Sequence, residues 1–303
     1  MSDADLLIAI PTFNRGELVE IAVRSLMQQA NESARWKILV VNNNSTDDTE
    51  VRLGGLAAQC SRLTYVFEPE PGLSHARNRA VKECKARYVL FADDECKFPS
   101  NYVDQTLTII DKRKPKIFGG PVLPWYSEPP PTWFKNEYGS YSLPYATSRA
   151  HRISLSGANI GFEREALIAV GCFDPALGMK GNVIGYGEET AAELRILARF
   201  GSEAVWYDAD FFNYHLVQPA KYQWRSLLGE HFRRGVARAK VKQVYLQDAA
   251  PPSPTIPECL SFRQAHGGAS RTIRWQNIAY ERGLPLVRHL GYVFGISTIS
   301  GTR

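Results

Sequence analysis

The chain has 303 residues, a length that suits one large domain or two small ones and that can bury a hydrophobic core. Hydrophobic residues make up 44% of it and charged residues 22%, which excludes wholesale disorder. Lysine and arginine total 36 against 31 aspartate and glutamate, and this net charge of +5 is too small to indicate nucleic-acid binding.

The cysteines and the N-terminal residues indicate a cellular compartment. No two of the five cysteines form a CxxC pair, so they favour a reducing compartment over a disulfide framework or a zinc site. Residues 1–15 lack the basic flank and long apolar run of a signal peptide. The sequence contains no run of 18 apolar residues, so no membrane span is expected. We therefore expect a cytoplasmic protein.

The first 120 residues alternate strand-like and helix-like segments. Expected strands are the short apolar runs at residues 6–10, 38–41, 63–67, 88–92 and 117–118. Helices are expected from residues 14, 48, 76 and 101. Asn14 and Glu17 stand at capping-box spacing, which predicts that Asn14 caps the first helix. The alternation predicts an α/β fold with a Rossmann-like, doubly wound, mostly parallel sheet.

The remaining segments are more varied. Residues 121–145 mix prolines with aromatic residues, which excludes a regular helix there. The expected elements that follow are a strand at 153–162, a helix at 163–170, a glycine-rich loop at 178–187, a helix at 188–200, a strand at 204–207 and a basic helix at 224–244. Ala191, Leu194, Leu197 and Ala198 are expected on the apolar face of the helix at 188–200. We predict one domain at 1–245, then a proline-rich linker and a helical C-terminal extension at 246–303.

Polar segments that follow the expected strands are candidates for a binding site. They lie at residues 11–15, 42–47, 68–78 and 93–95, and parallel strands bring such segments to one edge of the sheet. The stretch at 11–15 lacks the GxGxxG pattern, which disfavours a dinucleotide oxidoreductase. It also lacks the glycine- and lysine-rich phosphate loop that a nucleotidyltransferase needs.

The triplet Asp93-Asp94-Glu95 is the most informative of these segments. Adjacent acids repel one another unless a cation lies among them, and hard divalent ions prefer carboxylate oxygens. The alternative is a solvated acidic turn. The loop at 42–47 could bind a nucleobase or serve only as a turn. Arg77 could face a phosphate or be a surface charge.

Two later acids and a histidine are further candidates. Glu189 qualifies by residue type as a general base at the start of a helix. Its neighbour Glu188 is expected to point elsewhere, because adjacent helical residues are about 100° apart. His215 could be a metal or phosphate partner, or a buried structural histidine.

The order of the motifs resembles the family-two glycosyltransferases, which have the GT-A fold. The motifs are Ile-Pro-Thr-Phe-Asn-Arg at 10–15, Val-Val-Asn-Asn-Asn-Ser-Thr-Asp-Asp-Thr at 40–49, Pro-Gly-Leu-Ser-His-Ala-Arg-Asn-Arg-Ala at 71–80, Phe-Ala-Asp-Asp-Glu at 91–95, Ser-Gly-Ala-Asn-Ile-Gly-Phe at 156–162, Gly-Cys-Phe-Asp at 171–174 and Gly-Glu-Glu-Thr at 187–190. The resemblance covers residues 5–240.

The resemblance implies inverting transfer of a sugar from a nucleotide-diphosphate donor, most often a UDP-sugar, with Mn²⁺ or Mg²⁺. The implied donor-binding residues are Pro11, Thr12, Phe13, Arg15, Asn42, Asn43, Gly72, Arg77, Asp93 and Asp94. The implied metal ligands are Asp93, Glu95 and His215, and the implied catalytic base is Glu189. Trp125, Asn159 and Glu188 are the expected acceptor-binding residues. The acceptor is expected to be a glycan or a lipid-linked glycan.

Three positions depart from the family pattern. Asn42 and Asn43 replace acids that are common in the base-reading loop, Glu95 replaces the second acid of the DxD motif, and Glu189 replaces an aspartate. Because the carboxylates are kept, an active enzyme is favoured. The alternative is a non-catalytic module that binds nucleotide sugars or glycans. The aromatic residues of 124–145 could stack on sugar rings or form a packed core.

The helix between Lys221 and Lys242 carries seven basic residues interleaved with Trp224, Leu227, Leu228, Phe232 and Val236. Basic amphipathic helices bind anionic lipid surfaces, so this helix predicts peripheral contact with the inner face of the cell membrane. The alternative is a helix packed on the domain with a solvated basic face.

Overall fold

The computed structural model describes residues 4–141, 148–149, 155–180, 185–248 and 271–300. The chain divides into two compact units. Unit 1 comprises Met1–Trp125, Ser140–Ile184 and Glu188–Leu216, and unit 2 comprises Tyr126–Gly139, Gly185–Gly187 and Val217–Arg303. Within the described ranges, none of the helices combines the length and apolar character needed to cross a lipid bilayer.

An eight-stranded sheet forms the centre of unit 1, with the strand order β3-β2-β1-β4-β9-β6-β10-β8. Its strands are β1 (Leu6–Thr12), β2 (Trp36–Asn42), β3 (Leu63–Phe67), β4 (Tyr88–Phe91), β6 (Ile117–Gly119), β8 (Ser148–Arg149), β9 (Ile160–Glu163) and β10 (Val205–Tyr207). Strands β3, β2, β1 and β4 are parallel, β6 is parallel to β10, and β9 runs antiparallel between β4 and β6. The expectation of a mostly parallel sheet is thereby confirmed.

Three short strands form a second sheet in unit 1, in the order β5-β11-β7. They are β5 (Cys96–Lys97), β11 (Asn213–Leu216) and β7 (Val122–Trp125). Strand β11 is antiparallel to β5, which pairs His215 with Cys96. Because β5 directly follows the acid triplet, this pairing brings His215 next to it.

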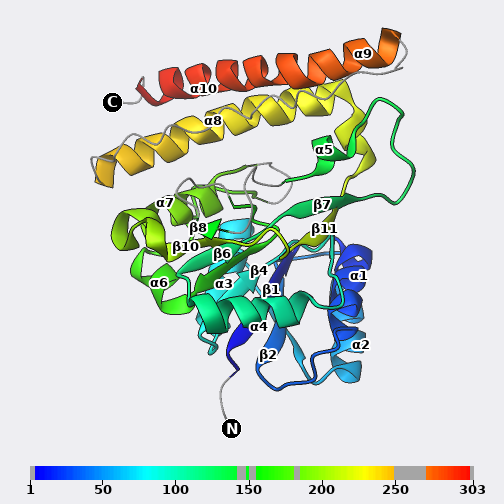
Figure 1. Ribbon diagram of the computed structural model, residues 1–303, viewed down its shortest axis with the longest axis vertical. Helices are drawn as coiled ribbons and strands as arrows, with labels where there is room; N and C mark the ends of the chain where they lie inside the picture. The colour runs from blue at the N-terminus through cyan, green and yellow to red at the C-terminus, as the bar shows by residue number, and fades with distance from the viewer. Residues whose placement is uncertain (1–3, 142–147, 150–154, 181–184, 249–270, 301–303) are drawn as a thin grey trace. The chain divides into compact units, whose positions relative to one another are not determined.

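Helices cover both faces of the main sheet, as a doubly wound fold requires. Helices α1 (Gly16–Met27), α2 (Thr49–Gln59) and α4 (Tyr102–Arg113) share one hydrophobic core with Leu6, Ile8 and Ile10 of β1 (Figure 1). Helices α3 (Leu73–Glu83), α6 (Arg164–Ala169) and α7 (Glu188–Phe200) share another core with the alternate β1 residues Leu7 and Ala9. Burying each large aliphatic side chain stabilises the fold by about 1.5–3 kcal/mol.

Two expectations about single elements are wrong. Asn14 does not cap α1; its φ is +52°, the helix begins at Gly16, and the Asn14 side chain instead accepts a hydrogen bond from the Thr46 backbone N–H. The strand expected at 153–162 is short: within the described residues it spans only Ile160–Glu163. The preceding residues bend because they pack around Arg77 and the end of β6.

Unit 2 contains an aromatic core. Its helical elements are α5 (Asn136–Gly139), the 3₁₀ turn Pro219–Tyr222, α8 (Trp224–Asp248), α9 (Arg271–Ile278), the π-helical turn Ala279–Gly283 and α10 (Leu284–Ser300). Trp133 stacks on Trp224 with 5.4 Å between ring centroids, and Tyr138 stacks on Tyr280 at 3.9 Å. For these residues of the proline-rich segment, the packed-core alternative therefore holds.

Helices α8 and α10 lie side by side in unit 2 (Figure 1). A Cβ atom on Gly235 would lie 2.0 Å from the Arg288 carbonyl oxygen, and one on Gly291 would lie 2.1 Å from the Phe232 carbonyl oxygen. Only glycine permits backbones to approach this closely. Helix α8, which lies mostly before residue 245, thus packs on α10, which lies after it. Both helices belong to unit 2, so the division into units 1 and 2 does not coincide with the predicted boundary at residue 245. That 1–245 folds as a domain stays a prediction.

Candidate active site

The acid triplet lies at the carboxyl edge of the main sheet, just after β4. The Thr12 hydroxyl at the end of β1 donates a hydrogen bond to Asp94 Oδ2 at 2.8 Å. Arg15 Nη1 donates to Asp94 Oδ1 and to Glu95 Oε2, both at 3.0 Å. Three donor-site candidates, from two separate segments, therefore meet in one hydrogen-bonded group.

Asp94 is the buried centre of this group. Burial and the nearby Glu95 carboxylate raise the pKa of Asp94 to about 6, although the Arg15 charge and the hydrogen bonds from Thr12 and Arg15 oppose the rise. Both carboxylate oxygens of Asp94 already accept hydrogen bonds from protein. Asp94 therefore joins the ends of β1 and β4, and its neighbours Asp93 and Glu95 are the acids that can meet a ligand.

His215 lies between those two acids. Its Nε2 atom is 3.2 Å from Asp93 Oδ2 and 3.2 Å from Glu95 Oε1, and its Nδ1 atom is 3.1 Å from the Leu216 carbonyl oxygen. Burial disfavours the charge of Asp93, but the hydrogen bond and charge of His215, helped by Arg77 and Arg15, outweigh it and lower the Asp93 pKa. If Nδ1–H donates to the carbonyl, Nε2 presents a lone pair to two carboxylates, an arrangement that a proton or a cation would stabilise.

These three side chains are the candidates from the sequence for part of a divalent-metal site. Two cis ligands of an octahedral ion lie about 3 Å apart when the metal–ligand distance is about 2.1 Å, similar to the separations at His215. Among the described residues, however, no set of three histidine, cysteine or acid side chains is arranged to hold a metal ion alone. The donor set fits a metal that takes its remaining ligands from a bound diphosphate and water.

The loop after β2 is held firmly by its own amides. Asn42 Nδ2 donates to Glu50 at 2.8 Å. Asn43 Nδ2 donates to the carbonyls of Glu68 and Glu70, while Asn43 Oδ1 accepts from the Gly72 N–H. Asn43 thus has no side-chain donor left to read a base, and it positions Gly72, whose φ of +149° only glycine adopts readily.

A cavity of about 370 Å³ opens beside this loop, at the carboxyl ends of β1 and β2. Its lining residues are Asn14, Arg15, Gly16, Glu17, Leu18, Asp47, Asp48 and Arg52. Pro11 is buried and Phe13 half-buried. The cavity is large enough for a small ligand, and Arg15, which lines it, also pairs with Asp94 and Glu95 of the acid triplet.

Arg77 joins the acid triplet to the start of α7. Although it is 2% exposed, its guanidinium donates from Nη1 to Glu188 Oε1 at 2.7 Å and from Nη2 to the Gly157 carbonyl at 3.2 Å. The same group lies 3.9 Å from Asp93 Oδ1 and 4.0 Å from Glu189 Oε2. The surface-charge alternative for Arg77 is therefore excluded, and acids far apart in sequence meet at one cation.

Glu188 and Glu189 do not point to different places, contrary to the expectation from helix geometry. Both carboxylates lie near Arg77 Nη1 because long side chains in a first helical turn can bend toward a shared cation. Glu188 is 3% exposed, and its burial together with the Glu189 charge raises its pKa against the pull of Arg77. The Glu188 side chain has little surface to offer an acceptor, whereas the Glu189 side chain is 23% exposed.

The other two acceptor candidates lie in different surroundings. Asn159 is fully buried: its Oδ1 accepts from the Tyr102 hydroxyl and its Nδ2 donates to the carbonyls of Pro121 and Phe211. Its amide therefore joins core segments. Trp125 is half-buried, donates from Nε1 to the Glu95 carbonyl at 3.0 Å, and has the Lys97 ammonium 3.5 Å from its ring centroid. Trp125 thus lies beside the acid triplet.

The sequence analysis missed Glu193, one turn after Glu189. Its side chain is fully buried and its Oε1 accepts a hydrogen bond from the Leu155 N–H at 2.8 Å. The apolar face expected for α7 included Ala198, which is exposed, while Glu193 takes a core position. No local pattern marks an acid that replaces an apolar residue in a core.

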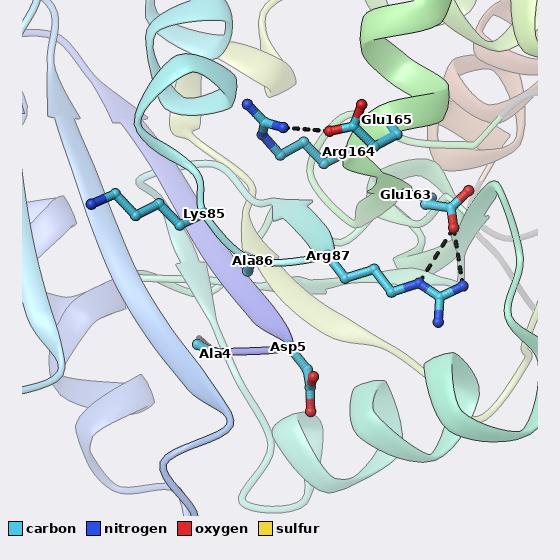
Figure 2. Close-up of a pocket in the computed structure, with 8 residues that line it drawn as sticks. All are labelled: Ala4, Asp5, Lys85, Ala86, Arg87, Glu163, Arg164 and Glu165. Atoms are coloured by element: carbon cyan, nitrogen blue, oxygen red, sulfur yellow. Dashed lines mark hydrogen bonds and ion pairs between the residues drawn. The ribbon is translucent and has the colours of Figure 1, made fainter. Parts of the chain in front are cut away.

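A second cavity of about 390 Å³ lies at the opposite, amino-terminal edge of the main sheet (Figure 2). Its charged residues largely pair with one another: Arg87 contacts Glu163 at 3.1 Å, and Arg164 pairs with Glu165. The acid triplet, His215 and Glu189 lie at the other edge. We therefore place the candidate site at the carboxyl edge, although the two cavities are similar in volume.

Curated relatives match this chain over part of its length. The chain is 27% identical over 107 residues to the putative teichuronic acid biosynthesis glycosyltransferase TuaG of Bacillus subtilis, which covers 35% of this chain and 42% of that protein. It is 26% identical over 113 residues to the UDP-Glc:alpha-D-GlcNAc-diphosphoundecaprenol beta-1,3-glucosyltransferase WfgD of Escherichia coli, covering 37% of this chain and 43% of that protein. The chain thus spans less than half the length of these relatives.

A solved structure extends the likeness to the whole fold. The mannosyltransferase PcManGT from Pyrobaculum calidifontis, in complex with GDP-Man and Mn²⁺, aligns with a TM-score of 0.63 at 15% identity, covering 100% of this chain and 77% of that one. This similarity confirms the GT-A fold with C-terminal helices. The model of the family described as "Glycosyl transferase family 2" matches residues 7–171, more than half of the chain. The chain therefore belongs to glycosyl transferase family 2.

Proposed function

We propose that this chain transfers a sugar, with inversion, from a UDP-sugar to a hydroxyl of a glycan or lipid-linked acceptor. The observation that carries the proposal is the position of Arg77. One guanidinium lies 3.9 Å from Asp93 of the acid triplet and 4.0 Å from Glu189, so a leaving diphosphate and an attacking hydroxyl could be served by neighbouring groups. Family membership supplies the inverting stereochemistry.

The donor nucleotide is assigned to the loops at the ends of β1 and β2. The nucleoside would occupy the cavity beside Arg15. The Gly72 backbone does not line this cavity; it is held by Asn43 and would contact the nucleoside from the loop before α3. Thr12, Asp94 and Asn43 keep these loops in place through their hydrogen bonds. The UDP-Glc donor in the name of the Escherichia coli relative supports UDP as the nucleotide.

Asp93, Glu95 and His215 are proposed to hold Mn²⁺ or Mg²⁺ on the diphosphate. Such an ion, when bound, neutralises the negative charge that develops on the leaving group. The bond from His215 Nδ1 to the Leu216 carbonyl fixes the ring so that Nε2 faces the acids. The Mn²⁺ in the Pyrobaculum structure supports this assignment.

Glu189 is proposed as the general base. It takes the proton from the acceptor hydroxyl while the acceptor oxygen bonds to the anomeric carbon and the bond from that carbon to the diphosphate breaks. The transition state has oxocarbenium character, as in glycoside hydrolysis. Glu189 lies in the first turn of α7, and its Oε2 atom is 4.0 Å from Arg77 Nη1. Glu188 holds Arg77 in position.

The acceptor is proposed to bind beside Trp125 and Glu189. The diphosphoundecaprenol acceptor in the name of the Escherichia coli relative supports a lipid-linked glycan. A cytoplasmic position at the inner face of the cell membrane suits such an acceptor. The four cysteines in the described residues are free, which supports a reducing compartment.

Transfer by Glu189→Gln tests the proposal. The substitution keeps the side-chain size and removes the proton acceptor, so kcat should fall by about 10²–10⁴. Free UDP released from a panel of UDP-sugars, with and without glycan acceptors, measures the rate. The exposed Glu165→Gln variant, on α6, is the matched control and should be as active as the wild type. UDP binding should survive in both.

Two results would contradict the proposal. If wild-type protein binds UDP-sugars but releases no UDP with any acceptor, the chain is a non-catalytic binding module. If Glu189→Gln transfers at the wild-type rate, the base lies elsewhere.

A further inference from the structure

The outward side of α10 is apolar. Five large hydrophobic side chains on this helix are between 47% and 67% exposed. They are Leu286, Leu290, Val293, Phe294 and Ile296, and we call them the α10 apolar face. Exposed apolar residues are ordinary when scattered, but a contiguous patch on one helix marks an interaction surface.

The opposite side of α10 is already used in packing. Leu284, Gly291 and Gly295 are buried, and the two glycines lie against the backbone of α8. At 100° per residue, Leu286, Leu290 and Val293 fall on the half of the helix turned away from these three residues. These three members of the α10 apolar face therefore point away from α8, whereas Phe294 lies at its border and contacts the Phe232 ring.

The same helix is almost uncharged, while its neighbour supplies cations. From Leu284 to Ser300 there is no acid. The α8 side chains Arg238 and Lys242 lie 5.7 and 5.9 Å from the ring centroid of Tyr292 on α10. Among the described residues, neither cation pairs with an acid, since Glu230 on α8 pairs with Lys221 and Arg234. The apolar face is therefore bordered by uncompensated positive charge.

Most of the apolar side of α8, which the sequence indicated as this surface, is packed, although Leu228 is 44% exposed. Trp224 stacks on Trp133 and Leu227 is buried in the same aromatic core. The Phe232 ring lies 5.6 Å from the ring of Phe294, and Val236 lies under Gly295. Because α10 and the aromatic core cover most of this side of α8, α10 exposes more large apolar side chains than α8 does among the described residues.

Two kinds of occupant differ in charge. A second copy of the chain would bring its own Arg238 and Lys242 to the contact, and like charges would repel. An anionic bilayer offers hydrocarbon for the apolar side chains and negative headgroups for the cations. We propose that the α10 apolar face, with Arg238 and Lys242, docks on an anionic lipid bilayer, with α10 in the plane of the interface. This inference goes beyond the proposed function and does not depend on it.

Flotation with lipid vesicles tests the docking surface. Full-length wild-type protein should float with phosphatidylcholine vesicles that contain phosphatidylglycerol, and high salt should reduce the bound fraction. Leu286→Ser/Leu290→Ser should weaken binding by about tenfold or more, because binding strength scales with buried apolar area. Arg238→Gln/Lys242→Gln should weaken it by about tenfold and remove most of the salt dependence.

Matched controls come from unit 1. Val51→Ser/Ile168→Ser removes exposed apolar side chains, and Lys82→Gln/Lys112→Gln removes exposed cations. Both control variants should bind vesicles like the wild type. Since all substituted residues are exposed, circular dichroism should show unchanged folding.

Three outcomes would overturn the proposal. The first is a wild type that does not float with anionic vesicles. The second is vesicle binding that both α10 and α8 variants retain in full. The third is a wild-type dimer, seen by light scattering, that Leu286→Ser/Leu290→Ser converts to a monomer without any vesicle binding, since the occupant would then be a second copy. None of these measurements requires transfer activity.

Discussion

The two sides of the candidate site differ in how completely their polar atoms are paired. On the donor side, the Asp94 oxygens and the Asn43 amide hydrogens all have protein partners. On the base side, Glu188 Oε2, Glu189 Oε2 and Arg77 Nε are buried without a hydrogen-bond partner in the described structure. The protein itself therefore provides hydrogen-bond partners for these polar atoms of the donor side, but not for those of the base side.

The difference indicates where substrate binding changes the protein most. A fully paired loop is already in its working position, so nucleotide binding needs little rearrangement there. Buried, unpaired acids are costly and are concentrated at functional sites. We expect the base side to be electrostatically strained and sensitive to substitution, and the donor side to act mainly as a rigid frame.

The largest expected effect is on the base side, at Arg77. Arg77→Met leaves Glu188 buried without its cation, which should lower the free energy of unfolding by about 3–5 kcal/mol. The double variant Arg77→Met/Glu188→Gln should recover much of that loss because the side chain at 188 then carries no charge that needs the cation. Urea unfolding near neutral pH measures both.

The neighbouring Arg79→Met variant is the control. Arg79 makes only part-exposed pairs with Glu83 and Glu68, so its loss should cost less than about 1 kcal/mol. Equal effects of Arg77→Met and Arg79→Met would contradict the strained pairing described for the base side.

The next effect concerns the acids that border the rigid frame. A ligand at a hundredfold excess over its Kd stabilises the folded protein by about 2.7 kcal/mol. Asp93→Asn should abolish the part of the stabilisation by UDP that depends on Mn²⁺. Asp94→Asn should lower stability without ligand but keep the Mn²⁺-dependent increment, because Asp94 joins β1 to β4. Thermal unfolding with UDP, with Mn²⁺ and with EDTA separates the two. An unchanged increment in Asp93→Asn would exclude Asp93 as a ligand.

Much of the frame was predictable because its signals are local. Apolar runs such as Leu6–Ile10 mark buried strands, and turn formers after them mark the carboxyl edge at which both Asp93 and Asn42 lie. The sequence predicted a strand ending at residue 162 but not its antiparallel direction between β4 and β6. The close approach of β9 to β6, where a Cβ on Gly161 would lie 2.1 Å from the Phe118 ring, was not predicted either.

The base side was less predictable because its signals are not local. Arg77 and Glu188 are 111 positions apart, and nothing in either segment specifies the pair.

The outward face of α10 was missed for another reason. Both sides of that helix are apolar, one against α8 and one exposed, so no amphipathic period marks it.

A smaller effect tests the donor side directly. Asn43→Ala removes the hydrogen bonds to Glu68, Glu70 and Gly72, which should lower the free energy of unfolding by about 1–3 kcal/mol and weaken UDP binding. Gln59→Ala, at an exposed amide on α2, should change stability by less than about 0.5 kcal/mol. If Asn43→Ala changes UDP affinity without changing stability, Asn43 contacts the base rather than the loop.

The smallest expected effect concerns Glu193, beneath the base. Burial is the main cause that raises the Glu193 pKa well above its ordinary value, with the Glu189 charge adding to the rise and the Leu155 N–H opposing it. The folded state therefore keeps a proton that the unfolded state loses above about pH 4.5. Stability should fall as pH rises from that value toward the folded-state pKa.

Glu193→Gln keeps an oxygen for the Leu155 N–H and cannot ionise, so it should remove this loss of stability. The difference between the Tm of the variant and the Tm of the wild type should increase by at least about 2 °C from about pH 5 to about pH 8. For a domain of this size, a change of about 2 °C in Tm corresponds to about 1 kcal/mol. Exposed Glu17→Gln should give a Tm difference that does not change with pH. A Tm difference for Glu193→Gln that is also constant would mean that Glu193 is ionised in the folded protein, and that the base side holds more paired charge than its unpartnered oxygens indicate.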